Sequence, residues 1–437
     1  MIGQCDFKVT VLAFCLLCIF SAFSIKEPLA KELSLQEAVL MAKSNSEALK
    51  ANVATAESAS FSADAAYGGL FPKLSLDGNY RRQSVVPEVT VGTKTIELTD
   101  SYSYSIGPTL TYTLWDSGLR RTQVSSLEEV SIAKAKQAVS TESQIVLATQ
   151  IAYVQTALAS ESLDFAQRAA VSSETQNKDI HFRLKGGASS RLDSLNSDAE
   201  VSNYRIKVQQ AMSDLKTAQA DLRYLIGDFQ TTDASVEGLA DLLSRSSSDQ
   251  SVNHGSFDPL SHPLIQAQSH LELAALSQAK SQRAGYWPNL NLQLRSSLDY
   301  PNGPAFEQIR QNTIALNFSW SLFEFGSTRN LVAAKSAEAM AAAHAKQDLE
   351  AGLKRDFEKA AAKIQGLRGQ LKEGEVLVSK LEELAKLNYS TYRFGRLSYS
   401  EVQTSNLRLL ETKIRVASLR AQLLVQLFNL QYLGEKE

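Results

Sequence analysis

The chain has 437 residues, which is enough for a large core or for two to three ordinary domains. Its formal net charge is −2 and its isoelectric point is about 6.3, so the charge balance gives no indication of a nucleic-acid partner. Outside the stretch 9–25, no apolar run approaches the roughly twenty residues of a membrane-spanning helix, which excludes an α-helical inner-membrane transporter.

Residues 1–30 are predicted to be a signal peptide, because their apolar run is short for a spanning helix and lies at the start of the chain. Cleavage is expected after Ser24 or after Ala30; a mis-assigned start and an uncleaved anchor are the alternatives. All three cysteines, at positions 5, 15 and 18, lie in this segment. The mature chain is therefore expected to owe nothing to disulfides or thiolate metal sites.

The first half of the mature chain, residues 31–226, is predicted to combine helices and strands. A helix over 33–66 begins with a capping box, in which the side chains of Ser34 and Glu37 each accept a hydrogen bond from the other's backbone amide. The elements that follow are a strand over 74–80, a polar loop over 82–100, a strand within 101–118, a helix over 119–184 and a helix over 190–226.

The strand within 101–118 has one apolar face and one small polar face. Its even positions from 102 to 114 are Tyr, Tyr, Ile, Pro, Leu, Tyr and Leu, and its odd positions from 101 to 113 are Ser, Gly or Thr. Side chains alternate between the two faces of a strand, so this pattern indicates an amphipathic strand. The same alternation returns over 314–322.

The second half, residues 262–437, repeats the plan of the first. LFPKLSL at 70–76 returns as YWPNLNL at 286–292, and LWDSG at 114–118 returns as LFEFG at 322–326. Each copy of the second motif is followed by a long helical pattern. Residues 227–261 join the halves as a linker or small appended structure, with one short amphipathic piece near 236–243.

Four amphipathic strands per chain suit a sheet with lipid on one face and water on the other, as in an outer-membrane barrel. About eight strands are needed to close a barrel, and unpaired strand edges are not tolerated in hydrocarbon. Three copies would supply twelve strands, so a homotrimer in outer-membrane lipid is expected. The residues predicted to face lipid are Tyr102, Tyr104, Leu110, Tyr112, Leu316, Phe318 and Trp320, and those predicted to face the lumen are Asp77, Asn79, Asn291 and Arg295.

The predicted helices are too long for an ordinary globular domain. At 1.5 Å per residue, the helix over 119–184 is roughly 100 Å long. The helices 34–66 and 190–226 contain together about as many residues, so they can stack end to end beside it. The expected fold is thus a β-barrel continued by a long α-helical barrel, closed by three protomers.

In the order and duplication of these motifs, the sequence resembles the TolC-type outer-membrane efflux and secretion channels, over about residues 33–434. The resemblance implies a homotrimeric export duct in the outer membrane of a Gram-negative bacterium, with its helical barrel in the periplasm. The duct would work with a periplasmic adaptor (membrane fusion) protein and an inner-membrane transporter of the RND or ABC type, in efflux or type I protein secretion. The resemblance does not identify the transported cargo.

The helical hairpins of each half carry the candidate entrance residues. Ser190 with Asp193, and Ser398 with Glu401, read as capping boxes. The resemblance implies that Asp193 and Glu401, with Arg191, also line the periplasmic entrance, where Thr404 replaces an acid found in many family members. The arginines 183, 191, 393 and 396 can bridge to these acids or remain solvated. The tips that resemble adaptor-docking hairpins are Lys185, Gly186, Gly187, Ala188, Phe394, Gly395, Arg396 and Leu397; a simple turn is the alternative.

The sequence contains no recognisable combination of catalytic residues. The five histidines are scattered, and there is no nucleophile elbow, Walker loop or dinucleotide fingerprint. We therefore expect no enzyme activity, no metal and no cofactor, and a passive duct whose energy comes from a partner. The alternative function is a secreted or periplasmic coiled-coil structural protein without a pore, for which four alternating strands would have no purpose.

Overall fold

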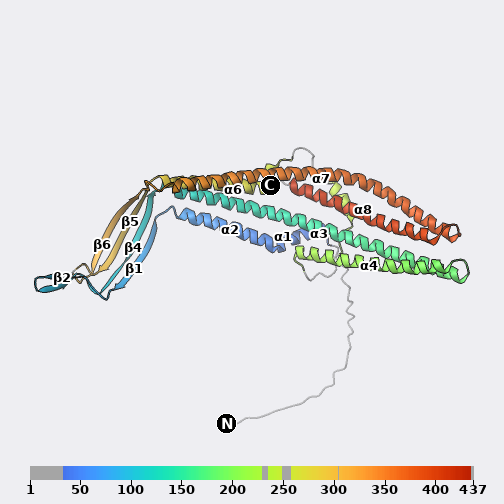
Figure 1. The fold of residues 1–437 in the computed structure, drawn as a ribbon, viewed down its shortest axis with the longest axis horizontal. Coiled ribbons are helices and arrows are strands. Elements are labelled where there is room, and N and C mark those ends of the chain that lie inside the picture. The colour runs from blue at the N-terminus through green and yellow to red at the C-terminus, as the bar shows by residue number, and fades with distance from the viewer. Residues whose placement is uncertain (1–32, 229–234, 249–256, 304, 435–437) are drawn as a thin grey trace, which may run out of the picture.

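The computed structural model describes residues 33–228, 235–248, 257–303 and 305–434. Within them the protein is elongated, with a β-sheet at one end and long helices extending away from it (Figure 1). The predicted signal peptide lies outside the described residues.

The main sheet contains the four long strands predicted from the sequence. They are β1 (Lys73–Arg82), β4 (Tyr102–Trp115), β5 (Asn289–Tyr300) and β6 (Ile309–Ser319), all antiparallel and in the order β1-β4-β5-β6. Strands β4 and β5 come from different halves of the chain, so the sheet joins the two repeats. Its outer strands β1 and β6 have no further partner among the described residues.

The register of the sheet sets apolar and polar residues into alternating rows. One row that crosses all four strands is Leu74, Leu110, Leu294 and Ile314, and the next is Ser75, Thr109, Arg295 and Thr313. A slip of one residue in any strand would move its apolar side chains to the polar face. The alternation in the sequence thus fixes which face is apolar.

Four long helices form two hairpins. The first is α3 (Leu119–Lys185) with α4 (Arg191–Ile226), and the second is α7 (Ser327–Arg393) with α8 (Tyr399–Leu433). Helices α3 and α7 have 67 residues each, or about 100 Å at 1.5 Å per residue. The equal lengths of α3 and α7 are direct evidence of the internal duplication.

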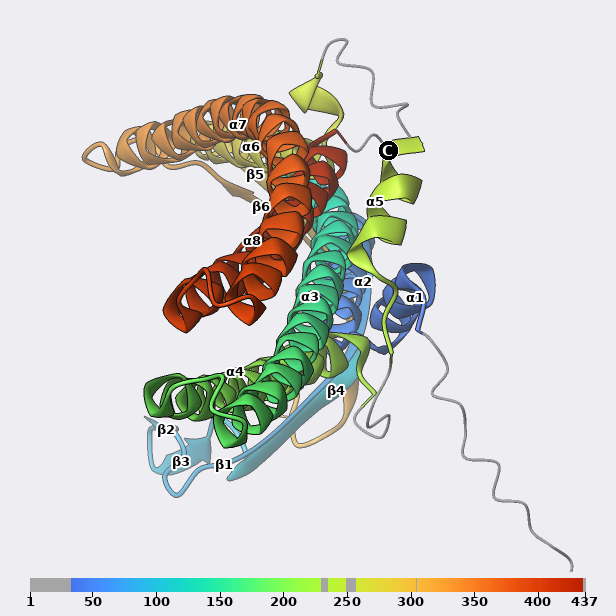
Figure 2. The ribbon, with the colours of Figure 1, turned by 90° about the vertical axis from the view of Figure 1, so that its right-hand side faces the viewer.

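Shorter helices complete a curved layer. Helices α1 (Leu35–Asn45), α2 (Glu47–Gly68) and α4 all lie along α3, and the Asn45 Nδ2 donates to the Ile226 carbonyl at 2.8 Å where α1 meets the end of α4. Helix α6 (Pro263–Gln282), preceded by the 3₁₀ turn Pro259–Ser261 and followed by a second at Arg283–Tyr286, lies between α3 and α7. Viewed from the hairpin ends, the helices follow an arc (Figure 2).

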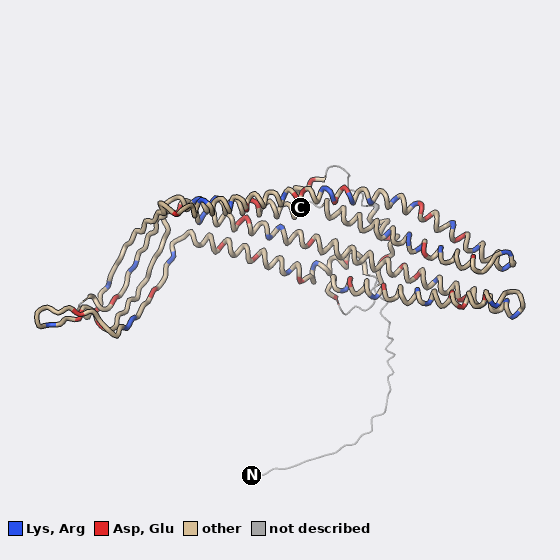
Figure 3. Tube along the Cα trace, viewed as in Figure 1, with Lys and Arg blue, Asp and Glu red and all other residues tan. Residues whose placement is uncertain are grey.

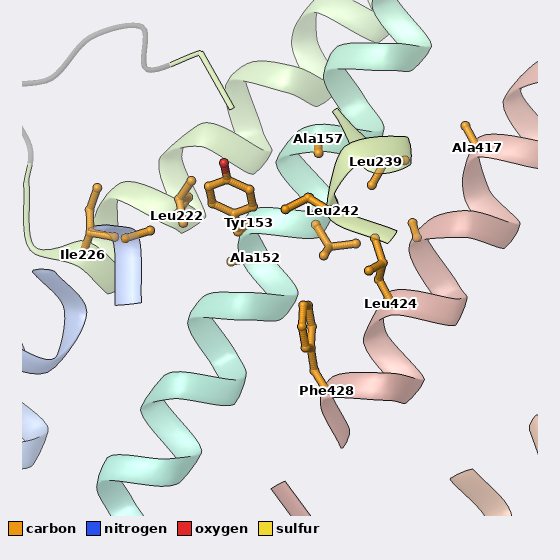
Figure 4. Close-up of a cluster of buried hydrophobic side chains, with 13 residues drawn as sticks. Ala152, Tyr153, Ala157, Leu222, Ile226, Leu239, Leu242, Ala417, Leu424 and Phe428 are labelled. Carbon is orange, nitrogen blue, oxygen red and sulfur yellow. The ribbon is translucent and has the colours of Figure 1, made fainter. Parts of the chain in front are cut away.

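The largest buried cluster lies midway along the helices, where α5 (Leu239–Ser248) packs between α3 and α8 (Figure 4). Tyr153 is fully buried there, and its hydroxyl donates to the Leu33 carbonyl at 2.5 Å and accepts from the Glu237 amide at 2.9 Å. The segment between the repeats is therefore anchored to the first long helix.

Three predicted boundaries were wrong. The helix expected over 33–66 is broken at Ser46, whose extended backbone (ψ 111°) ends α1 and whose hydroxyl accepts from the Leu49 amide to begin α2. The loop expected over 82–100 contains a hairpin of β2 (Glu88–Val91) and β3 (Lys94–Glu97), paired through Val89 and Ile96. The strand predicted over 314–322 corresponds to β6, which ends at Ser319, so Trp320 lies just beyond the strand.

No helix within the described ranges combines the length and the apolar character needed to cross a membrane.

Candidate channel surfaces at the sheet and at the hairpin ends

The apolar face of the sheet is open to its surroundings. In the single chain Leu74 is 70% exposed, Ile314 is 79% exposed and Leu316 is 61% exposed. Tyr102, Tyr104, Leu110, Tyr112 and Phe318 lie on the same face, each exposed or half-buried. A contiguous apolar face of this size marks contact with a membrane or with another protein.

Aromatic residues lie at both ends of this face. At the end farther from the helices, Tyr300 stacks between Tyr102 and Tyr104, with ring centroids 5.1 and 5.4 Å apart. At the other end a bulge in β4 brings Trp115 opposite Leu290, and the Trp320 Nε1 donates to the Tyr286 carbonyl at 3.2 Å. Aromatic belts of this kind flank the apolar band of outer-membrane barrels.

The opposite face of the sheet is polar and hydrogen-bonded. The Arg295 Nη2 donates to the Ser105 Oγ at 2.9 Å, and the Ser105 hydroxyl donates to Asp299 at 2.5 Å. Closer to the helices, the Thr113 hydroxyl donates to the Asn291 Oδ1 at 2.7 Å. The register places Asp77, Asn79, Asn291 and Arg295 on this face, as the alternation predicts.

Arg120 joins the sheet to the helices in the first repeat. Its Nε pairs with Asp116 at 2.8 Å, while its Nη1 and Nη2 donate to the carbonyls of Gly69 and Thr113 at 2.9 and 2.8 Å. The guanidinium thus connects the end of α2, the end of β4 and the start of α3. The equivalent position of the second repeat is Thr328, which bonds Glu324 instead.

The two hairpins end side by side at the far end of the molecule. Both turns need a left-handed residue, which Gly187 (φ 75°) and Gly395 (φ 72°) supply without a Cβ penalty. Around them Lys185, Gly186, Ala188, Phe394 and Arg396 are exposed and Leu397 is half-buried. The Arg183 Nη2 donates to the Arg393 carbonyl at 2.7 Å, which ties one turn to the other.

Asp193 forms the predicted capping box and also reaches the other hairpin. Its amide donates to the Ser190 Oγ at 3.0 Å, and its Oδ2 accepts from the Ser190 amide at 3.3 Å. The same Oδ2 lies 3.5 Å from the hydroxyl of Tyr392 on α7, which also contacts Ser189 at 3.0 Å. Asp193 therefore has a contact beyond that of a helix cap.

The second predicted capping box was wrong. The Ser398 hydroxyl pairs with the Ser400 hydroxyl at 2.9 Å and makes no cap bond, because Ser400 competes for it at close range. Glu401 stays exposed in the first turn of α8, and the Thr404 hydroxyl donates to the Ser400 carbonyl at 2.9 Å. Arg191 is exposed as well. Among the described residues, Asp193 is the one of the four predicted entrance residues whose side chain forms a hydrogen bond to the opposite hairpin.

Two acids that are not among the predicted site residues connect the hairpins. The Tyr389 hydroxyl donates to Asp179 at 2.9 Å, beside Arg183 and Arg393 at 3.6 and 3.8 Å from the same carboxylate. Deeper in the bundle, the Tyr399 hydroxyl donates to the Glu200 Oε2 at 2.5 Å. The partners of Asp179 and Glu200 lie 210 and 199 residues away along the chain, so no local pattern could have identified these acids.

Glu200 is a buried acid among uncharged neighbours. It is 7% exposed, and the polar groups that face it are Tyr204 on its own helix and Tyr399, Gln403 and Asn406 on α8. Burial raises the pKa of Glu200 above its usual value, and the hydrogen bonds from α8 offset only part of that effect. The packed hairpins therefore hold a proton on Glu200 more tightly than separated hairpins would.

The contact between α4 and α8 is expected to weaken as pH rises. Between the ordinary pKa of a glutamate and the raised one, the packed form binds more protons, so the separated fraction increases by up to about tenfold per pH unit. Spin labels at the exposed positions Ser202 and Arg408 would report the separation. Glu200→Gln keeps a neutral acceptor for Tyr399 and should remain packed at every pH; an unchanged pH dependence in that variant would contradict this role.

Comparison with known proteins gives the family. The family model described as "Outer membrane efflux protein" matches residues 39–228 and 260–434, which together make up most of the chain. The chain belongs to this family. No protein in the curated set matches the sequence.

Solved outer-membrane channels share the fold. CusC superposes with a TM-score of 0.79 at 15% identity, covering 93% of both chains. CmeC of Campylobacter jejuni gives 0.78 at 14% identity, over 92% of this chain and 85% of that one, and VceC of Vibrio cholerae gives 0.76 at 16%, over 92% and 96%. The predicted resemblance and the predicted fold class, long helices joined to an antiparallel sheet, are confirmed.

The described residues contain no group of three or more His, Cys, Asp or Glu side chains placed to hold a metal ion.

Proposed function

We propose that this efflux-family protein is a passive export duct formed by three copies of the chain. The observation that carries the proposal is the four-stranded sheet with two free edges and an exposed apolar face. In hydrocarbon both edges need partners, and three copies would close a twelve-stranded barrel with β6 of one protomer beside β1 of the next. The polar face around Arg295 would then line the lumen.

The spacing of the aromatic belts supports insertion in an outer membrane. From Tyr104 to Trp115 is eleven residues along β4, or about 36 Å at 3.3 Å per residue, and a strand tilt of about 40° reduces the height to about 28 Å. That height is close to the apolar band of outer-membrane barrels, about 25 Å. The apolar face would contact lipid, and the helices would extend about 100 Å into the periplasm.

The hairpin ends would form the periplasmic entrance and the docking site for partners. Asp193, Asp179 and Glu200 hold the hairpins of one protomer together through Tyr392, Tyr389 and Tyr399, so they favour a closed entrance. The exposed turn residues 185–188 and 394–397 would contact a periplasmic adaptor, which connects the duct to an inner-membrane RND or ABC transporter. Such a transporter would supply the energy for efflux or type I secretion.

Single-channel recording tests the proposal. Protein extracted from outer membranes with detergent and added to a planar lipid bilayer should give discrete, long-lived conductance steps. Protein that fractionates as a soluble species and gives no channels would instead support a coiled-coil structural role. That alternative leaves the exposed apolar face of the sheet without a purpose.

A further inference from the structure

The hairpin ends are positively charged in a chain that is nearly neutral. Residues 179–193 and 389–401 contain five cations (Arg183, Lys185, Arg191, Arg393 and Arg396) against three acids (Asp179, Asp193 and Glu401), an excess of two positive charges. Adding a further turn of helix on each side includes Lys178 and Lys386 as well, so the net charge of the hairpin ends stays positive. Figure 3 shows Lys and Arg gathered at both hairpin ends.

Two of the three acids are already engaged within the protomer. Asp179 accepts from Tyr389 and lies between Arg183 and Arg393, so this group keeps one net positive charge. Asp193 is held by its capping box and by Tyr392. Only Glu401 is exposed without a side-chain partner among the described residues.

Three of the cations are exposed and outside any described ion pair, and Arg191 lies near enough to Asp198 to help lower the pKa of that carboxyl. Lys185, Arg191 and Arg396 are solvent-exposed, and none forms an ion pair with another described residue. The helix dipoles do not offset them, because each hairpin brings one N-terminus and one C-terminus to the same end and their partial charges cancel.

We propose that these cations make the entrance of the duct selective for anionic solutes. This inference rests on the proposed function, in which three copies bring nine such cations, three from each chain, to one opening. At an ionic strength of about 0.01 M the Debye length is about 30 Å, so charges in the last turns act on the opening whichever way each side chain points. The cation excess attracts anions and repels cations.

The ratio of anion to cation permeability measures this selectivity. In a KCl gradient at low salt, the reversal potential of the wild-type channel should show that chloride passes more readily than potassium. The triple variant Lys185→Gln, Arg191→Gln, Arg396→Gln removes the free cations. If the electrostatic energy of a unit charge at the entrance changes by about one kT in this variant, the ratio of anion to cation permeability falls about sevenfold. Anion enrichment and cation depletion each change by a factor of e.

A matched variant controls for the loss of charge elsewhere. Lys216, Lys363 and Lys372 are exposed, form no described ion pair and lie at least twenty residues from the turns along α4 and α7. Their replacement by Gln should leave the reversal potential near the wild-type value. The difference between the two triple variants should also shrink as the salt is raised, because screening shortens the reach of each charge.

The possible outcomes separate this inference from the proposed function. Absence of channels from wild-type protein overturns the duct itself. Channels that prefer potassium, or that keep their preference in the Lys185/Arg191/Arg396 variant, leave the duct standing and overturn the anion-selective entrance. A chloride preference that is lost in that variant and kept in the control supports the inference.

Discussion

Leu294→Arg is expected to prevent stable insertion of the sheet into lipid. Leu294 lies in the apolar row with Leu110 and Ile314, near the middle of the strands. A charged arginine at that depth on a lipid-facing strand costs about 2–4 kcal/mol. Folding into lipid vesicles, followed by denaturant titration, should show a loss of that size or no folded trimer.

The neighbouring residue provides the control for this substitution. Gln293 lies on the same strand but on the polar face, between Thr111 and Ala315. Gln293→Arg places the same side chain toward the lumen, where water solvates it, and should cost little. Equal losses in both variants would show that the apolar face does not meet lipid.

Asp193→Ala is expected to raise the conductance of the channel several-fold, and by more than Glu401→Ala does. Asp193 accepts hydrogen bonds within its own cap and lies 3.5 Å from the Tyr392 hydroxyl on the other hairpin, whereas the Glu401 side chain has no partner in the described structure. Loss of the Asp193 carboxylate removes a contact between hairpins and loosens the entrance. Single-channel recordings of the two variants give the comparison.

Two further variants separate the cap from the contact. Ser190→Ala removes the hydroxyl that caps α4, at a cost of about 1 kcal/mol, and leaves the Asp193 carboxylate facing Tyr392. Tyr392→Phe removes the contact and leaves the cap. The gating role requires Tyr392→Phe to raise the conductance and Ser190→Ala to leave it near wild type; the reverse pattern would reduce Asp193 to a helix cap.

The sheet and the long helices were predictable because their signals are repetitive. Alternation over fourteen residues of β4 fixes a strand and its two faces, and two helices of 67 residues follow the same Leu-x-x-x-Gly motif. The offset between LFPKLSL and YWPNLNL placed β1 and β5 in corresponding positions. These patterns extend over many residues, so one atypical position does not erase them.

The details missed in the sequence depend on single side chains or on distant contacts. Ser46 breaks the helix predicted over 33–66 because its hydroxyl caps the next helix. Ser398 and Glu401 have capping-box spacing, yet a hydroxyl two residues away forms the bond. The pairing of Glu200 with Tyr399 joins positions 199 apart in the chain, which a single sequence cannot place together.

The proposed duct requires that other copies of the chain close the four-stranded sheet into a barrel. Native mass spectrometry of the detergent-extracted protein tests this directly, since one chain with its first thirty residues has a mass of 47.9 kDa. We expect a single species containing three chains. A stable monomer that retains the sheet and the long helices would contradict it.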